Sequence, residues 1–155
     1  MNLKIDQKIF EQFPEVIVGV ATLHDINNTK DDPEITKALR NAESEVINSI
    51  GEMPITEHPF ITPWREAYRQ FGAKPKDYPS SIENLLRRVL KGEQIRHINK
   101  LVDIYNVISL KYLVPVGGED ISKIKGDVFL TFASDNETPT VLLGENEARP
   151  PHPGE

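Results

Sequence analysis

Residues 99–120, NKLVDIYNVISLKYLVPVGGED, join a helix signal directly to a segment that no helix can continue through. Asn99 is a favourable N-cap residue, and apolar side chains then recur at helical spacing. We expect the inward face of this helix to consist of Leu101, Val102, Tyr105 and Ile108. Pro115-Val116-Gly117-Gly118 predicts a tight turn, because proline has no N–H to donate and glycine lets the backbone approach another group closely.

Upstream of this stretch the sequence predicts three more helices. The first begins after the N-cap Asp32, has proline at its first position and ends at Gly51. The second opens at Thr62-Pro63 and ends at Gly72. Their apolar faces are Ile35, Leu39, Ala42, Val46 and Ile50 in the first helix, and Trp64, Ala67, Tyr68 and Phe71 in the second.

The third of these helices begins at a capping box. Ser80 and Glu83 have the spacing at which each side chain accepts a hydrogen bond from the other's backbone N–H. Gly92 ends the helix, and its buried stripe is expected to be Ile82, Leu85, Leu86 and Val89.

Strands are predicted at both ends of the chain. Glu15 to Leu23 is rich in β-branched residues and is typical of a buried strand. Asp127 to Ala133 and Thr140 to Leu143 are two further strands, with a hairpin loop at Asp135 to Pro139 between them. The order of strand, helices and then strands predicts a single α+β domain.

The composition is that of one ordinary domain of 155 residues, with 38% apolar and 27% charged residues. We assign residues 1–148 to this domain and the proline-containing residues 149–155 to a tail. No apolar run approaches the roughly 20 residues needed to cross a bilayer, and no signal peptide is recognisable. The absence of cysteine excludes disulfides and thiolate metal sites. We therefore expect a cytoplasmic protein without membrane contact.

Positive charge is concentrated in one part of an acidic chain. The net charge is -6, yet residues 65–100 hold nine Lys and Arg against four Asp and Glu, which gives this segment +5. Such a segment can position a phosphate backbone locally. The alternative is a solvated helix face whose charge is balanced by acidic side chains folded against it.

Polar residues gather between Asp103 and Asp120. Asp103 and Asn106 are three residues apart and share one side of a helix, and the N–H groups of the following glycine pair are available to an oxyanion. The alternative is a capped helix end followed by a solvated turn. No P-loop, GxGxxG, GxSxG or HExxH motif is present, and the four histidines are scattered, so we expect neither a cofactor nor a metal.

Several stretches together resemble a known family. Residues 98–107 are similar to a helix with a Val-Asp-Val-Thr-Asn core, and residues 115–120 to the turn that follows it, Pro-Met-His-Ala-Phe-Asp. Both belong to the editing module, the B3/B4 domain, of the phenylalanyl-tRNA synthetase β subunit. Residues 64–68, 78–83 and 109–112 resemble the free-standing versions of that module. The resemblance runs from about Trp64 to Leu143.

The resemblance implies a layered α+β domain in which helices pack on a β-sandwich-like core. It also implies hydrolysis of the ester of mischarged tRNA, acting in trans, with tRNA and a synthetase as partners. Asn106 matches the family's Asn, whereas Tyr105 stands in place of Thr and Gly117 in place of His. Both departures suggest that the rejected amino acid is not tyrosine. Family sequences continue beyond the position of Glu155, so we expect further chain after it.

These considerations lead to a hypothesis for the site. The catalytic residues are Asn106, which orients water or the amino group, and Gly117 and Gly118, whose N–H groups hold the ester carbonyl. Substrate contacts are assigned to Tyr105, Ser109, Lys111, Glu119 and Asp120, and phosphate contacts to Arg65, Arg69, Arg87, Arg88 and Lys91. Two alternatives remain open: a module that binds tRNA or an amino acid without hydrolysis, and an adaptor that associates with a synthetase.

Overall fold

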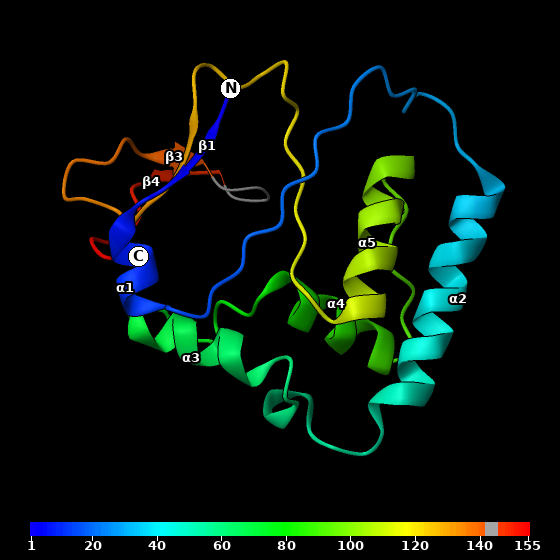
Figure 1. Ribbon diagram of the computed structural model, residues 1–155. Helices are drawn as coiled ribbons and strands as arrows, with labels where there is room; N and C mark the ends of the chain where they lie inside the picture. Colours follow the sequence, from blue (N-terminus) through cyan, green and yellow to red (C-terminus); the bar gives the residue numbers. More distant parts are fainter. Residues whose placement is uncertain (142–145) are drawn as a thin grey trace.

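The chain is built from two groups of elements joined by extended connections. The computed structural model describes residues 1–141 and 146–155. In Figure 1 the long helices lie on one side of the molecule, and the small sheets lie on the other. The long helices are α2 (Pro33–Ile50), α4 (Ser81–Leu90) and α5 (Lys100–Tyr112). Residues 13–32 and 113–127 run between the two sides without a helix or strand.

Helix α2 begins and ends where the sequence predicts. The Asp32 side chain accepts a hydrogen bond from the backbone N–H of Glu34 at 3.0 Å, which satisfies one of the free donors of the first turn. Gly51 follows the last residue with a φ of +69°, a conformation that favours glycine. The predicted apolar face is confirmed from Leu39 onward, because Leu39, Ala42, Val46 and Ile50 are buried.

Helix α4 contributes the centre of the core. Ile82 and Leu86 are fully buried and Val89 is nearly so, as its predicted stripe requires. The capping box forms only in part. Ser80 Oγ accepts from the N–H of Glu83 at 3.4 Å, but one Glu83 carboxylate oxygen accepts from arginines and the other has no hydrogen-bond partner. The prediction that Glu83 caps Ser80 was therefore wrong, since arginine donors compete for the same carboxylate.

Helix α5 lies along α2 and has a polar buried face (Figure 1). Asn99 caps it as predicted, accepting from the N–H of Val102 at 3.0 Å. The predicted inward face was wrong at Ile108, which is 42% exposed. The residues that turn inward are Asp103, Asn106, Ser109 and Leu110. Polar side chains can occupy these inward positions because Asp103 and Ser109 form hydrogen bonds there, as described below.

The remaining helices are short. They are α1 (Gln7–Gln12), the 3-10 turn η1 (Ile55–Glu57) and α3 (Thr62–Gln70). Helix α3 matches the predicted second helix, and Gly72 follows it with a φ of +85°. No residue of α3 is fully buried, although Tyr68 and Phe71 pack edge to face at 5.0 Å between ring centroids.

Each sheet has two strands. Strand β1 (Leu3–Ile5) pairs in parallel with β2 (Val128–Leu130), and β3 (Thr140–Val141) pairs antiparallel with β4 (Ala148–Arg149). The predicted hairpin across Asp135 to Pro139 was wrong, because the strands on either side of that loop have other partners. Leu142 and Leu143, which we assigned to a strand, lie outside the described residues.

The predicted strand from Glu15 to Leu23 was also wrong. This segment is extended but pairs with no strand, and Ile17 is 91% exposed and Val20 66% exposed. A β-branched run forms a strand only where a neighbour and a packing surface meet it, and the described residues offer neither.

The fold is α+β, as predicted. Residues 1–141 and 146–155 hold two separate two-stranded sheets, so the expected sandwich core is not found among them. None of the described helices is long and apolar enough to cross a membrane.

Candidate functional site

The middle of α5 and the turn after it meet at Tyr105. A Cβ atom added to Gly118 would lie 3.4 Å from Cε1 of the Tyr105 ring, so the glycine backbone runs directly against that ring. A Cβ at Gly117 would meet nothing within 4 Å. Neither N–H of this glycine pair donates a hydrogen bond to an acceptor within the part of the chain that the structure describes. The turn therefore offers two free donors beside an aromatic ring.

Asn106 is the neighbouring polar group. The residue is only 9% exposed, and its amide has no hydrogen-bond partner among residues 1–141 and 146–155. Neither amide atom is among the fully buried atoms that lack a partner, so the amide still reaches solvent. It is therefore available to a polar ligand.

The other predicted substrate residues are placed differently. Ser109 is 1% exposed, and its hydroxyl donates to the carbonyl of Val114 at 2.6 Å, which ties down the end of α5. Lys111 is exposed and lies over the ring of Tyr112, with Nζ 5.5 Å from the centroid. Glu119 and Asp120 are both exposed. Hydrogen bonds from Ser122 hold the pKa of Asp120 below its usual value, so this carboxylate is charged.

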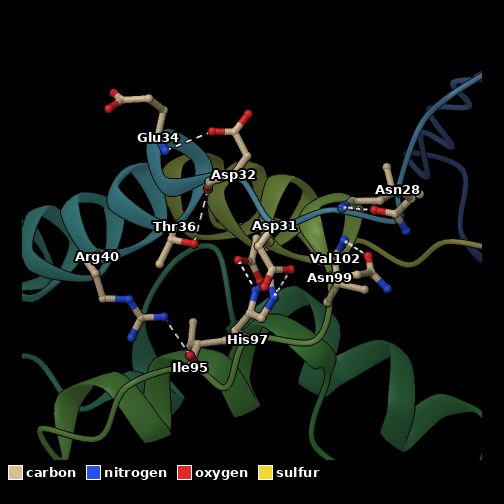
Figure 2. Close-up of polar contacts among 12 residues, drawn as sticks. Asn28, Asp31, Asp32, Glu34, Thr36, Arg40, Ile95, His97, Asn99 and Val102 are labelled. Carbon is tan, nitrogen blue, oxygen red and sulfur yellow. Dashed lines mark hydrogen bonds and ion pairs between the residues drawn. The ribbon is translucent and has the colours of Figure 1, made fainter.

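A second polar centre lies near the start of α5 and was missed by the sequence analysis. His97 stands between two carboxylates: Nδ1 is 2.8 Å from Asp103 Oδ2, and Nε2 is 3.0 Å from Asp31 Oδ1 (Figure 2). Asp103 is fully buried, whereas the Asp31 side chain is 79% exposed. The hydrogen bond to Asp103, and then that to Asp31, raises the pKa of His97 above its ordinary value.

The chain around His97 is anchored to α2. Glu43 Oε1 accepts from the N–H of Ile95 at 2.7 Å. Arg40 Nη2 donates to the carbonyl of the same residue at 2.7 Å (Figure 2). Arg40 and Glu43 also pair with each other at 3.0 Å. On the other side, Asn28 accepts from the N–H of Leu101 at 3.1 Å and joins the segment before α2 to the first turn of α5.

No local sequence pattern indicated the contact between His97 and Asp103. In the hydrophobic staple the residue directly before the N-cap packs against the fourth helical residue. With Asn99 as the N-cap these positions are Ile98 and Asp103, and His97 lies one residue further out. Asp31 is 66 residues away, and no local pattern points to it.

The predicted phosphate-binding residues divide into two groups. Arg65 and Arg87 both donate to Glu83, at 2.7 and 2.6 Å, and the Arg65 side chain is only 13% exposed. Arg69 pairs with Glu66 on the surface of α3. Arg88 and Lys91 are exposed and, with Asn84, Leu85, Arg87 and Glu93, line an open depression at the end of α4. The charge offered to solvent is therefore centred on Arg88 and Lys91.

Within residues 1–141 and 146–155, no group of three or more His, Asp or Glu side chains could hold a metal ion.

The match to a known family covers the first polar centre and, of the second, His97 and Asp103. The model of the B3/4 domain matches residues 63–155, which is more than half of the chain. The chain belongs to the B3/4 domain family. This domain is found in the β subunit of phenylalanyl-tRNA synthetase, so its function is tRNA-related. The predicted resemblance is thereby confirmed. No curated protein and no solved structure matches the chain.

The matched B3/4 region contains every predicted site residue, from Arg65 to Asp120, together with His97 and Asp103. Asp31, Arg40 and Glu43 come from the segment that precedes it.

Proposed function

We propose that this B3/4 domain hydrolyses the ester bond of mischarged aminoacyl-tRNA. The observation that carries the proposal is the unpartnered Asn106 amide, which lies next to a Tyr105 ring covered by the Gly118 backbone. An aminoacyl ester is already activated, so positioning a water molecule and stabilising the developing oxyanion account for much of the catalysis.

Each group has a role that its surroundings permit. The free N–H groups of Gly117 and Gly118 hold the ester carbonyl oxygen as it becomes negative. The Asn106 amide orients the attacking water. The ring of Tyr105 bounds the space for the amino-acid side chain, and we expect it to determine which amino acid is rejected.

Binding of the tRNA backbone is assigned first to Arg88 and Lys91. They are exposed, whereas the Arg65 guanidinium is largely buried against Glu83. Arg87 is 41% exposed and borders the same depression, so we assign it a weaker contact with the tRNA backbone.

The decisive experiment measures the release of amino acid from a panel of correctly and wrongly charged tRNAs. We expect one mischarged pair to be hydrolysed and the correct pairs to be spared. Asn106→Ala should slow that reaction on the order of 100-fold, the scale of a lost oxyanion or water contact, with little change in tRNA affinity. Asn48→Ala, which removes an exposed amide on α2, is the matched control. Retention of tRNA without any release would make this a binding module.

The tRNA contact is tested by salt dependence. Arg88→Gln with Lys91→Gln removes two exposed cations, so the slope of log affinity against log salt should fall by roughly 1–2 units. Lys8→Gln with Lys37→Gln removes the same charge from α1 and α2. Equal slopes for the two double variants would remove the α4 depression from the interface.

A further inference from the structure

Two carboxylates hold the imidazole of His97 in a defined orientation, and none of the roles proposed above involves this imidazole. Resting on the function just proposed, we propose that His97 is the general base of the deacylation, oriented by the buried Asp103. Asp31 keeps the imidazole protonated and inactive until the α-ammonium group of the aminoacyl ester pairs with the Asp31 carboxylate.

Asp103 fixes the orientation of the ring. It is fully buried, and its Oδ2 atom lies 2.8 Å from Nδ1, so Nδ1–H donates to it and Nε2 is the nitrogen left for proton transfer. The backbone two residues earlier is held by Arg40 and Glu43 at Ile95. The imidazole is thus preorganised from two directions, as a proton-transferring group must be.

Asp31 is suited to a reversible contact. Its side chain is 79% exposed, and it ends residues 13–32, which contain no helix or strand. While Asp31 and Asp103 both accept from the ring, both ring nitrogens are engaged, and these two hydrogen bonds raise the pKa of His97 and so favour the charged imidazole. Arg40 and Glu43, which hold the backbone at Ile95, are paired with each other.

The substrate carries the cation that can release the base. Its α-ammonium replaces the imidazolium as the partner of the Asp31 carboxylate, so one ion pair is exchanged for another. His97 then loses the acceptor at Nε2 and gives that proton to solvent, which leaves a neutral imidazole held only by Asp103. Substrate binding and activation of the base are thereby the same event.

The imidazole and the Asn106 amide belong to one site. Asp103 and Asn106 are both buried and three residues apart on α5, which is about 4.5 Å along the helix axis. Tyr105, in contact with the Gly118 turn, lies between them in sequence. The base and the amide therefore lie about one helical turn apart on one side of α5, and the turn that carries the oxyanion donors contacts the same helix at the Tyr105 ring.

The reaction balances in two steps. Water oxygen adds to the ester carbonyl while Nε2 takes the water proton, and the carbonyl electron pair moves onto the oxygen held by Gly117 and Gly118. The tetrahedral species then collapses and breaks the bond between the carbonyl carbon and the ribose oxygen, which receives the proton from Nε2. The products are the free amino acid and tRNA with an intact ribose hydroxyl.

The experiment uses the full chain and the mischarged tRNA identified by the panel, in single-turnover hydrolysis. His97→Ala should lower the rate about 100-fold or more, the scale of general-base loss, and added imidazole should restore part of it. His58→Ala removes an imidazole that stacks on Phe60 and should leave the rate unchanged. Circular dichroism checks that each variant is folded.

The role of Asp31 is tested with an N-acetylated aminoacyl-tRNA, which lacks the ammonium. The unmodified chain should hydrolyse the acetylated ester at least 10-fold more slowly than the free amine, and Asp31→Asn should remove this discrimination. Asp31 is largely exposed, so this variant keeps the test valid even where His97→Ala fails to fold.

The outcomes separate the two proposals. No hydrolysis by the unmodified chain overturns the deacylase and the base together. If the unmodified chain hydrolyses the ester and His97→Ala hydrolyses it equally fast, His97 is not the general base, and the deacylase proposal stands. The same conclusion follows if added imidazole does not restore the rate of His97→Ala and Asp31→Asn still hydrolyses the free amine faster than the acetylated ester.

Discussion

At the scale of single residues, Glu83 is the most consequential buried charge. It is fully buried and accepts from both Arg65 and Arg87, which come from different helices. Removing one partner of a buried ion pair leaves the others uncompensated. We therefore expect Glu83→Ala to lower the free energy of unfolding by about 3 kcal/mol, measured by urea denaturation. Glu66→Ala breaks the exposed pair with Arg69 and should cost less than about 0.5 kcal/mol. Equal costs would mean that Glu83 is hydrated.

The glycine pair allows a second comparison at this scale. Valine at position 118 must displace the Tyr105 ring, whereas valine at position 117 points into open space. We expect Gly118→Val to be about 1 kcal/mol less stable than Gly117→Val, the usual scale of overpacking. The same urea titration measures both. Indistinguishable stabilities would show that the ring moves away without cost.

How far the sequence predicted individual residues depended on how far away their partners lie. Asp32, Ser80 and Asn99 were identified as caps because a cap and the backbone N–H that donates to it are two or three residues apart. Asn106 and the glycine pair were selected by the local polar pattern and by the family resemblance, and their role stays a prediction. Arg65 and Asp31 were missed as partners of Glu83 and His97, since Arg65 is 18 residues from Glu83 and Asp31 is 66 residues from His97.

At the scale of elements, His97 links the segment before α2 to α5 through hydrogen bonds to Asp31 and Asp103. Its pKa is raised by the hydrogen bond to Asp103 and then by that to Asp31, so folding favours the protonated imidazole. This stabilisation is fully present below the unfolded-state pKa of about 6.5 and is lost as the pH rises through the raised folded-state pKa.

The stability difference between the unmodified chain and His97→Gln should therefore shrink as the pH is raised. Urea midpoints measured from pH 5 to 9 test this, with His58→Gln as the control for loss of a half-buried imidazole ring that stacks on Phe60. A difference that stays constant over the whole range would mean that the folded-state imidazole does not gain a proton from its two carboxylates.

The segment from Glu15 to Leu23 offers a test of where the core lies. Because Ile17 and Val20 are exposed, replacing both by serine should change the free energy of unfolding by less than about 0.5 kcal/mol. Leu39→Ala, within the core between α2 and its neighbours, should cost about 3 kcal/mol. A large loss from the serine variant would favour the buried strand that the sequence predicts.

Helices were predictable from the sequence because their signals are local. Periodicity, caps and glycine stops all act within one or two turns, and α2, α3, α4 and α5 were located by them. Two predicted strands contain β2 and β3, but their pairing was not predicted: β1, the partner of β2, is more than 100 residues away from it. The inward face of α5 was misjudged because buried polar residues there violate the apolar pattern.

At the scale of the whole molecule, stability is concentrated in the helices. The buried apolar cluster draws on α2, α4, Ile61, Ile95 and Leu110, and none of its members comes from a strand. We expect the amides of Leu39, Leu86 and Leu110 to exchange with solvent most slowly, and those of β1 to β4 much faster. Hydrogen exchange measured by NMR decides this. Equal protection in β1 and α5 would mean that the two sides unfold together.

The parallel pairing of Leu3–Ile5 with Val128–Leu130 also has a consequence for biosynthesis. The first strand leaves the ribosome with no partner available, while the chain that separates it from β2 is still being made. In that interval α2, α4 and α5 can assemble from contacts made within their own stretch of sequence. Strand β1 is thus made before its partner and is among the last of the described elements to reach its place.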